Sequence, residues 1–331
     1  MIAVTGATGH VGNALVRKLV ECGYSVRAIV PPKEDLSSLE GLEVEVFRAD
    51  VRDVDTLKEA LTGVDGVFHL AGIISIVEGK EDLMYSVNVS GTQNIVNICL
   101  ELNIPRLVYT SSVHAFPVPP KGVAITEETV IDPQAVVGAY ARTKALATLA
   151  VEEGIEKGLN AVILFPSGVI GPFDYKISEM GQLFLDYARG YFYYVDGEYD
   201  FVDVRDVVDG IVAAYERAEK GERFILSGHL LRIKQILYTI QQVTRQRLKS
   251  FKIPLPLARF ASLFTPLQKY FSKKKPRFTG YSLYVLNSNT ILSSQKAERI
   301  LGYKPRNFID TAKDTIIWFI NQGLIKRPRL N

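Results

Sequence analysis

The amino-acid sequence predicts an α/β fold, with a parallel β-sheet covered by helices on both faces and a smaller, mostly helical C-terminal portion. Three observations lead to this prediction. Short apolar runs alternate with helical patterns over residues 1–110, which is the order expected of βαβ units. These runs contain few polar residues, as is typical of strands covered on both faces. A glycine-rich turn, TGATGHVG, directly follows the first run.

Each strand and helix is indicated by its own residue pattern. Runs rich in β-branched and aromatic residues predict strands, at 2–5, 24–30, 42–50, 66–72, 106–112, 161–166 and 223–226, with 191–195 as a further short candidate. Apolar residues at every third or fourth position predict helices, at 10–23, 54–63, 82–102, 138–158, 177–189 and 204–219. From about residue 230 the pattern is mostly helical, with proline-rich interruptions at 253–267 and a last amphipathic helix at 309–324.

Composition and charge exclude several classes of protein. The chain has 331 residues, 47% of them apolar and 23% charged, and its net charge is +3. This charge is too small to indicate nucleic-acid binding. Cys22 and Cys99 have the spacing of neither a disulfide framework nor a metal site, and we expect both in the core. No signal peptide, membrane span or metal-binding cluster is visible, so a cytoplasmic protein is expected.

The turn after the first strand indicates a ligand. Glycines fall at positions 6, 9 and 12, between a strand and a helix. Gly6 allows the tight turn, Gly9 lets the backbone approach a pyrophosphate, and Gly12 lets the helix pack close to the sheet. The free N–H groups of the helix N-terminus favour an anion. This position in a βαβ unit predicts a dinucleotide site; the alternative is an ordinary tight turn.

The second strand bears on the choice of dinucleotide. NAD sites usually carry Asp or Glu about 20 residues past the glycine loop, where the carboxylate bonds the ribose hydroxyls. Here the sequence reads AIVPPK, and the first acid is Glu34. Because an acid at that position would repel a 2′-phosphate, its absence and the nearby Lys33 favour NADP(H) over NAD(H).

A Y-x-x-x-K pattern occurs twice, as Tyr140/Lys144 and as Tyr270/Lys274. The second pair lies beside a lysine run where the sheet pattern has ended, and we interpret it as coincidence. The first pair follows a strand that ends in serines, on one face of a predicted helix. The charges of Lys144 and an oxidised nicotinamide would favour the phenolate, so that Tyr140 exchanges a proton near neutral pH. The alternative is a surface tyrosine.

Further motifs follow the predicted elements in order. They are TGATGHVG at 5–12, HLAG at 69–72, NVSGTQN at 88–94, YTSS at 109–112, FPSGVIGP at 165–172 and FVDVRDVVDG at 201–210. Together with Tyr140 and Lys144 they resemble the extended branch of the short-chain dehydrogenase/reductase superfamily, the NAD-dependent epimerase/dehydratase family. The resemblance covers nearly the whole chain and is less specific after about residue 230.

The resemblance implies a Rossmann-type doubly wound sheet. Residues 1–170, with 200–227 returning to them, would hold the dinucleotide, and 171–199 with 228–331 would bind the substrate. The cofactor contacts it implies, with Lys33 added from the residue pattern, are Gly6, Thr8, Gly9, His10, Val11, Gly12, Lys33, Asp50, Val51, Leu70, Ala71, Gly72, Tyr140, Lys144, Pro166 and Val169.

The same resemblance assigns catalytic roles. Tyr140 would be the acid–base group and Lys144 would bond the nicotinamide ribose. Ser112 would hold the substrate oxygen as it becomes alkoxide-like, and Asn88 would orient a proton-relay water. His69 is expected to be structural. The expected substrate contacts are Ile74, His114 and Ser167.

The substrate class is indicated by the segment after the sixth strand. Sugar-nucleotide epimerases and dehydratases of this superfamily usually place asparagine there, whereas this chain reads Pro166-Ser167-Gly168, like the dihydroflavonol-reductase and 3β-hydroxysteroid-dehydrogenase branches. Apolar segments at 73–74, 116–120 and 191–195 favour a ketone, aldehyde or alcohol on an apolar or ring-bearing molecule. The alternative interpretation of these segments is ordinary core.

Alternatives remain at this point. One is a sugar-nucleotide epimerase or dehydratase that retains its NAD, and another is an inactive dinucleotide-sensing regulator. Residues 251–277 are expected to form part of the substrate-binding portion, the alternative being an amphipathic segment on a membrane surface. A homodimer through the helices at 82–102 and 138–158 is implied by the family.

Overall fold

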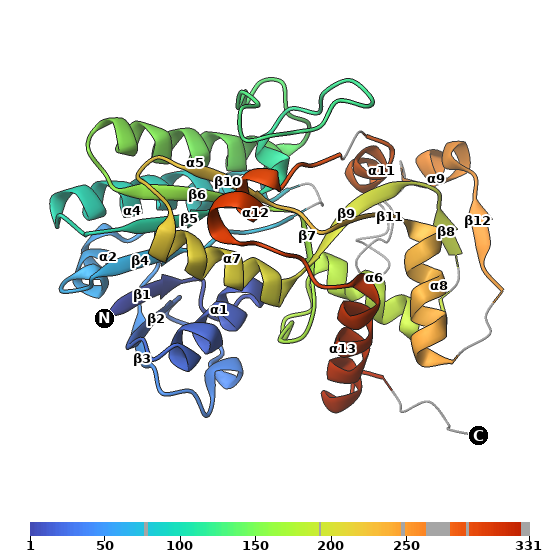
Figure 1. Ribbon diagram of the computed structural model, residues 1–331, viewed down its shortest axis with the longest axis horizontal. Coiled ribbons are helices and arrows are strands. Elements are labelled where there is room, and N and C mark those ends of the chain that lie inside the picture. Colours follow the sequence, from blue (N-terminus) through green and yellow to red (C-terminus); the bar gives the residue numbers. More distant parts are fainter. Residues whose placement is uncertain (76–78, 192, 246–248, 263–278, 289–290, 326–331) are drawn as a thin grey trace.

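The computed structural model describes residues 1–331 except 76–78, 192, 246–248, 263–278, 289–290 and 326–331. At its centre is a seven-stranded sheet, in which all neighbouring strands are parallel (Figure 1). In spatial order the strands are β10 (Arg223–Leu226), β6 (Ala161–Pro166), β5 (Leu107–Thr110), β4 (Gly66–His69), β1 (Ile2–Thr5), β2 (Val26–Val30) and β3 (Glu45–Arg48). The strand order reverses beside β1, and ligands of doubly wound sheets bind at the carboxyl ends of the strands at such a point.

Helices cover both faces of this sheet and bury all of its strands except the edge strand β3, which is largely exposed. One face carries α1 (His10–Glu21), α7 (Val204–Arg217) and α12 (Gln295–Leu301), and the other carries α2 (Val54–Leu61), α4 (Gly91–Glu101) and α5 (Ala139–Glu156) (Figure 1). Strands β1, β4, β5 and β6 are buried along their whole length. Their mostly apolar sequences follow from this, because each side chain meets a covered face.

The helix expected at 82–102 exists but is not uniform. It begins as α3 (Glu81–Met84), widens into a π-helical segment, η2 (Tyr85–Ser90), and continues as α4. Single π-helical turns inside α-helices often lie at functional sites. Here the segment carries Asn88, which is buried.

The remaining elements form the C-terminal portion, which lies beyond the ends of β6 and β10 in Figure 1. Its helices are α6 (Glu179–Ala188), α8 (Ile233–Thr244), α9 (Leu255–Ser262), α11 (Gly280–Asn287) and α13 (Phe308–Asn321). Its strands are β7 (Gly168–Ile170), β8 (Tyr193–Val195), β9 (Glu198–Asp203), β11 (His229–Arg232) and β12 (Phe251–Ile253). Strand β9 pairs with β7 and β11, and β12 pairs with β8. A separate apolar core joins α6, α8 and α13.

The structure corrects several sequence-based expectations. Strands β7, β9, β11 and β12 were not predicted, because they are three to six residues long and carry charged or small residues. The portion after residue 230 is therefore less purely helical than expected. Cys99 is buried as predicted, but Cys22 is exposed because it caps the end of α1. The pair Tyr270/Lys274 lies outside the described residues.

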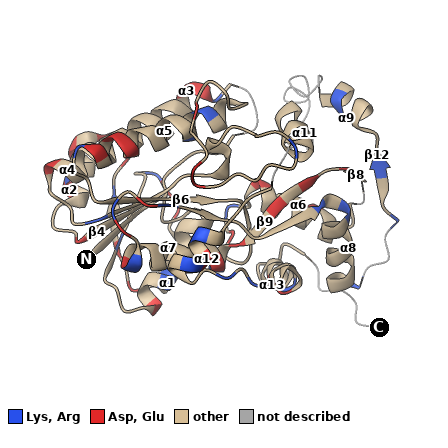
Figure 2. Cartoon of the chain, turned by 45° about the horizontal axis from the view of Figure 1, so that its top comes forward, with Lys and Arg blue, Asp and Glu red and all other residues tan. Residues whose placement is uncertain are grey.

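Residues of both charge signs are spread over the elements around the main sheet and over the C-terminal portion, including β9, β12, α8 and α9 (Figure 2). None of the helices that the structure describes is both long and apolar enough to cross a membrane.

Candidate active site

The glycine loop between β1 and α1 is built for close approach of a ligand. Gly6 has φ +71°, and a Cβ there would lie 2.8 Å from the backbone nitrogen of Ala71. A Cβ on Gly12 would lie 2.1 Å from the Gly6 oxygen, so the helix packs tightly against the turn. Gly9 caps α1 without a side-chain hydrogen bond, which leaves the first N–H groups of the helix for an anion. These residues fit the pyrophosphate of a dinucleotide.

The segment after β4 completes this cradle. The backbone nitrogens of Leu70 and Ala71 both donate to Thr5 Oγ1 at 3.2 Å. The Thr5 hydroxyl lies 2.7 Å from His69 Nδ1, and the other ring nitrogen lies 2.9 Å from Thr92 Oγ1. Burial, together with the charge of Lys144, lowers the pKa of His69 to about 3. His69 is therefore a neutral ring that ties β1 to β4 and α4, as expected of a structural histidine.

The predicted adenosine-side residues lie at the carboxyl ends of β2 and β3. Lys33 is exposed in the loop after β2. The Asp50 carboxylate accepts from Arg52 Nε at 2.9 Å and Nη2 at 2.6 Å, and this pairing lowers the pKa of Asp50. The Val51 carbonyl accepts from Asn94 Nδ2 at 2.9 Å. The structure thus places these residues around one end of the cradle, with the Asp50 side chain already engaged.

The four predicted catalytic residues are all buried near the carboxyl end of β5. Ser112 follows β5, Tyr140 and Lys144 lie on α5, and Asn88 lies on η2; none of them is more than 7% exposed. Burial raises the pKa of Tyr140 to about 12, and the nearby Ser112 side chain opposes this rise. The structure therefore places the serine and tyrosine side chains in the same buried region.

Lys144 is buried on the same helix as Tyr140. Burial lowers its pKa to about 8, and its Nζ donates to the Thr110 carbonyl at 3.0 Å while lying 5.2 Å from the centre of the Tyr109 ring. That Lys144 and an oxidised nicotinamide together favour the Tyr140 phenolate stays a prediction, because in the chain alone burial raises the pKa of Tyr140. Burial is the larger influence on both groups, and it favours the neutral form of each.

Asn88 holds the loop after β4. Its Oδ1 accepts from the Ile73 nitrogen at 2.7 Å, and its Nδ2 donates to the Ile73 carbonyl at 3.0 Å and to Thr143 Oγ1 at 3.1 Å. A Cβ on Gly72 would lie 3.3 Å from Asn88 Oδ1 and 3.7 Å from Lys144 Nζ. Asn88 and Lys144 thus face the same short segment, and Asn88 fixes its backbone.

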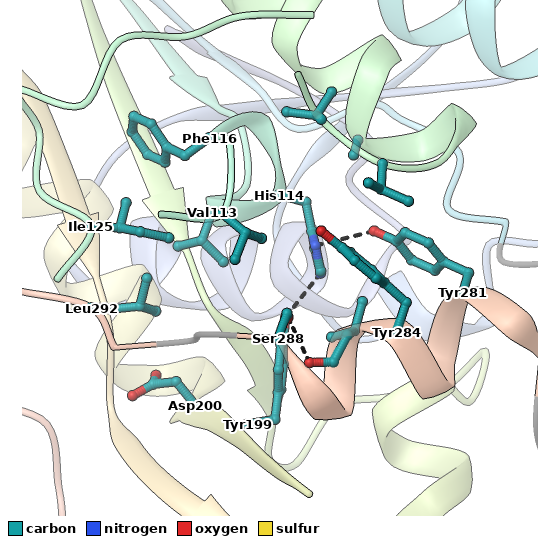
Figure 3. Close-up of a pocket in the computed structure, with 15 residues that line it drawn as sticks. Val113, His114, Phe116, Ile125, Tyr199, Asp200, Tyr281, Tyr284, Ser288 and Leu292 are labelled. Atoms are coloured by element: carbon teal, nitrogen blue, oxygen red, sulfur yellow. Dashed lines mark hydrogen bonds between the residues drawn. The ribbon is translucent and has the colours of Figure 1, made fainter. Parts of the chain in front are cut away.

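On the other side of Tyr140, His114 is the centre of an aromatic cluster (Figure 3). Its Nε2 lies 2.9 Å from the Tyr199 hydroxyl and its Nδ1 lies 3.1 Å from the Tyr281 hydroxyl. The ring centres of His114 and Tyr140 are 5.8 Å apart, edge to face. Burial lowers the pKa of His114 to about 4. His114 is therefore a neutral ring that links Tyr140 to β9 and α11.

A cavity of about 40 Å³ adjoins His114. Its lining is mostly aliphatic and aromatic and comprises Val113, His114, Phe116, Val118, Ile125, Val136, Val137, Ala141, Tyr199, Asp200, Tyr281, Tyr284, Val285, Ser288 and Leu292. Of the three predicted substrate contacts, His114 lines this cavity but Ile74 and Ser167 do not. Ile74 is 59% exposed, and Ser167 is buried after β6, where its nitrogen donates to the Leu226 carbonyl.

Three residues near the site were missed from sequence. Tyr199 lies two residues before the motif at 201–210 and is not part of it, and Tyr281 lies in a helix without a motif, so nothing local pointed to His114. Lys176, in the segment after β7, donates from Nζ to Thr8 Oγ1 in the glycine loop at 3.0 Å. An isolated lysine in a loop carries no sequence signal. The remaining predicted contacts, Pro166 and Val169, lie at the end of β6 and in β7.

A doubly wound parallel sheet with a glycine-rich cradle, and a buried Tyr–Lys pair beside it, defines a dinucleotide-dependent enzyme. The chain belongs to the NAD dependent epimerase/dehydratase family, whose family model matches residues 2–227. The resemblance inferred from the motifs is thus confirmed, as is the Rossmann-type fold.

Relatives along almost the full length narrow the class. The chain is 35% identical to sterol demethylase protein B of Methylococcus capsulatus, over 97% of this chain and 99% of that protein. It is 31% identical to a putative dihydroflavonol 4-reductase of Synechocystis sp., over 98% and 95%. The crystal structure of gox2253 is similar with a TM-score of 0.87 and 34% identity, over 98% and 99%. Within this NAD-dependent family the chain is an oxidoreductase.

Proposed function

We propose that this enzyme interconverts a ketone or aldehyde and an alcohol on an apolar, ring-bearing molecule, with NADP(H) as the hydride carrier. The observation that carries the proposal is the burial of Ser112, Tyr140 and Lys144 together near the end of β5, with Tyr140 and Lys144 one turn apart on α5. These residues lie at the carboxyl end of β5, on the edge of the sheet that also forms the glycine-loop cradle. Hydroxyl groups in this position can hold a carbonyl oxygen and exchange a proton with it.

Each catalytic side chain then has a distinct task. Tyr140 gives a proton to the substrate oxygen during reduction and takes it back during oxidation. Ser112 donates a hydrogen bond to the same oxygen, which stabilises the charge that develops there. A bound dinucleotide supplies or accepts the hydride at the nicotinamide ring. Lys144 lies beside the nicotinamide ribose and the Tyr140 hydroxyl. Because its pKa is lowered to about 8, it can give up or keep a proton there near neutral pH.

The substrate class is supported by the residues around His114 and by the relatives. The cavity wall is built mainly from valine, isoleucine, leucine and tyrosine side chains, which suits an apolar molecule oriented by a few polar groups. The names of the two relatives refer to a sterol and to a dihydroflavonol, both of which are polycyclic. No asparagine follows β6 to hold a sugar nucleotide; that position is Ser167.

The preference for NADP(H) is supported by the charge around the end of β2. Pro31 follows the strand where an NAD site carries an acid. Arg48 Nη1 donates to the Pro32 carbonyl at 2.7 Å, so a guanidinium lies at this loop. The Glu34 carboxylate is paired with Lys176 at 2.5 Å, which removes much of the repulsion that it would exert on a 2′-phosphate.

Two organisational features belong to the same proposal. Residues 1–170 and 200–227 hold the dinucleotide, while 171–199 and 228–331 enclose the substrate. The enzyme forms a homodimer through the helices at 82–102 and 138–158. Sedimentation at micromolar concentration would test the dimer, and a single species of 36.8 kDa would contradict it.

Turnover assays test the function directly. We expect the purified protein to oxidise NADPH stoichiometrically with a panel of polycyclic ketones, such as steroid 3-ketones and dihydroflavonols. Catalytic conversion of a UDP-sugar with NAD retained through purification would contradict the proposal and favour an epimerase or dehydratase. Dinucleotide binding without turnover of any panel member would favour a regulator instead.

A further inference from the structure

A short segment crosses the glycine loop from the substrate side of the molecule. We define the strap as residues 171–177, between β7 and α6, and Figure 1 shows this loop beside α1. His10 Nε2 lies 3.0 Å from the Pro172 carbonyl. The Arg17 guanidinium lies 5.0 Å from the centre of the Phe173 ring and donates to the Tyr175 hydroxyl at 3.2 Å. The strap is therefore held against α1 and the cradle at several points.

The conformation of the strap is fixed from within as well. Phe173 and Ile177 have φ values of +70° and +49°, which non-glycine residues rarely adopt and which persist only where the surroundings enforce them. Between them, the buried Asp174 carboxylate accepts from the Ser178 nitrogen at 2.9 Å and from its hydroxyl at 2.7 Å. The Tyr175 ring packs edge to face on Trp318 of α13 at 5.4 Å. Strained backbone held in this way is characteristic of functional segments.

The strap places the side chain of Lys176 beside the cradle. Its Nζ lies 3.0 Å from Thr8 Oγ1 in the glycine loop and 2.5 Å from Glu34 Oε1 in the loop after β2. These two loops border the pyrophosphate and the adenosine ribose of a dinucleotide in this fold. The ammonium group therefore lies where the phosphates of the ligand would be.

We propose that Lys176 is a phosphate-binding residue of the dinucleotide site, and that Glu34 is the internal anion which occupies Lys176 until a phosphate replaces it. The side chains of Lys176 and Glu34 are 51% and 19% exposed, and ion pairs this accessible to water are weak and easily exchanged. The pyrophosphate carries two negative charges in all and a 2′-phosphate carries about −1.5 to −2 at pH 7, against one charge on a carboxylate, and phosphate oxygens accept strong charge-assisted hydrogen bonds from lysine. Lys176 thus contributes a phosphate contact from outside the glycine loop and the second strand.

The inference rests on dinucleotide binding by the family and is independent of the proposed substrate. Its test is isothermal titration of the purified full chain with NADPH and with NADH, which requires no turnover. We expect Lys176→Met to weaken binding by about 10- to 100-fold, the effect of losing a charged hydrogen bond, and Lys176→Arg to restore most of it. A loss confined to NADPH assigns the contact to the 2′-phosphate, and an equal loss for both dinucleotides assigns it to the pyrophosphate.

Glu34→Gln separates phosphate binding from a merely structural ion pair. If Lys176 only anchors the strap through its ion pair with Glu34, then Lys176→Met and Glu34→Gln should both weaken NADPH binding, and by similar amounts. If Lys176 binds phosphate, Glu34→Gln frees it and tightens NADPH binding by several-fold. The matched control is Lys157→Met, which removes an exposed lysine paired at 2.6 Å with Glu153 on the opposite face of the sheet, and it should leave both affinities unchanged. Dissociation constants for Lys176→Met within twofold of the parent protein, with unchanged thermal unfolding, would overturn the proposal.

Discussion

The two sides of the active site are built in different ways. On the cofactor side, backbone groups of neighbouring elements form the cradle, with Gly6, Gly9 and Gly12 within one turn. On the substrate side, His114 depends on hydroxyl groups that lie 85 and 167 positions away in the sequence. The cofactor side is therefore encoded locally, whereas the substrate side exists only once the C-terminal portion has packed against the sheet.

The two sides nevertheless share one electrostatic property. Burial moves every titratable group at the centre toward its neutral form, with the pKa of Lys144 lowered to about 8, that of His114 lowered to about 4 and that of Tyr140 raised to about 12. Lys144, with its pKa of about 8, still carries a positive charge at neutral pH, but burial outweighs the influence of this charge on Tyr140. The further charge that would activate Tyr140 would have to come with a ligand.

The largest effect is expected at the point where the two sides meet. Tyr140→Phe removes the proton donor and should lower kcat by about 10²- to 10⁴-fold, while leaving the dissociation constant for the dinucleotide almost unchanged. Steady-state kinetics and titration on the same preparation measure both quantities. Tyr238→Phe is the control, because Tyr238 lies on α8 and is 62% exposed. Turnover retained in Tyr140→Phe would show that the acid–base group lies elsewhere.

The contrast between the two sides also explains what could be predicted from sequence. The main-sheet strands were predicted because burial on both faces makes them apolar runs, and the glycine loop because its turn, approach and packing demands fall within seven residues. Tyr199 and Tyr281 were not, because a tyrosine in a three-to-six-residue strand or a short helix looks like core or surface alike. Lys176 was missed because an isolated lysine in a loop carries no sequence signal.

Lys144 offers a stability test of buried charge on the cofactor side. Its pKa of about 8 lies below the ordinary 10.5, so between pH 8 and 10.5 the unfolded chain binds a proton that the folded chain does not. Stability therefore rises with pH across this window, by about 3 kcal/mol from Lys144 alone, and the destabilising effect of the charge is fully present below pH 8. Lys144→Met should abolish this rise.

Urea unfolding at pH 7, 8, 9 and 10 measures the effect as the difference between Lys144→Met and the parent protein. The difference removes the opposing contribution of Tyr140, which has a raised pKa and loses stability above pH 10 in both proteins. Parallel stability curves for the two proteins would mean that Lys144 is fully charged in the folded state at pH 9.

On the substrate side, His114→Phe should act on stability and on substrate affinity together. The change leaves the hydroxyls of the buried Tyr199 and the half-buried Tyr281 without their shared partner, at a cost of about 1–3 kcal/mol in the free energy of unfolding. We expect KM to rise about tenfold, because the cavity wall shifts, while dinucleotide affinity stays constant. A fall in dinucleotide affinity instead would show that the two sides are not built independently.

The same histidine has a pH signature. Its pKa of about 4 lies below the ordinary 6.5, so stability is lost as the pH falls from 6.5 toward 4, where the unfolded chain takes up a proton that the folded chain does not. His69 contributes in the same direction in both proteins. The parent protein should therefore lose more stability than His114→Phe over this range, as measured by urea unfolding.

The smallest expected effect, from Tyr281→Phe, tests how much the distant partner adds. This change removes the 3.1 Å hydrogen bond to His114 Nδ1 but keeps the ring, which packs so closely on Gly138 that a Cβ there would lie 2.7 Å away. Because Tyr199 still holds the other ring nitrogen, unfolding should become easier by only about 1 kcal/mol, and KM should change less than twofold. If Tyr281→Phe instead matched His114→Phe, the hydroxyl would be a substrate contact in its own right, since neither the packing nor the position of His114 would account for such a loss.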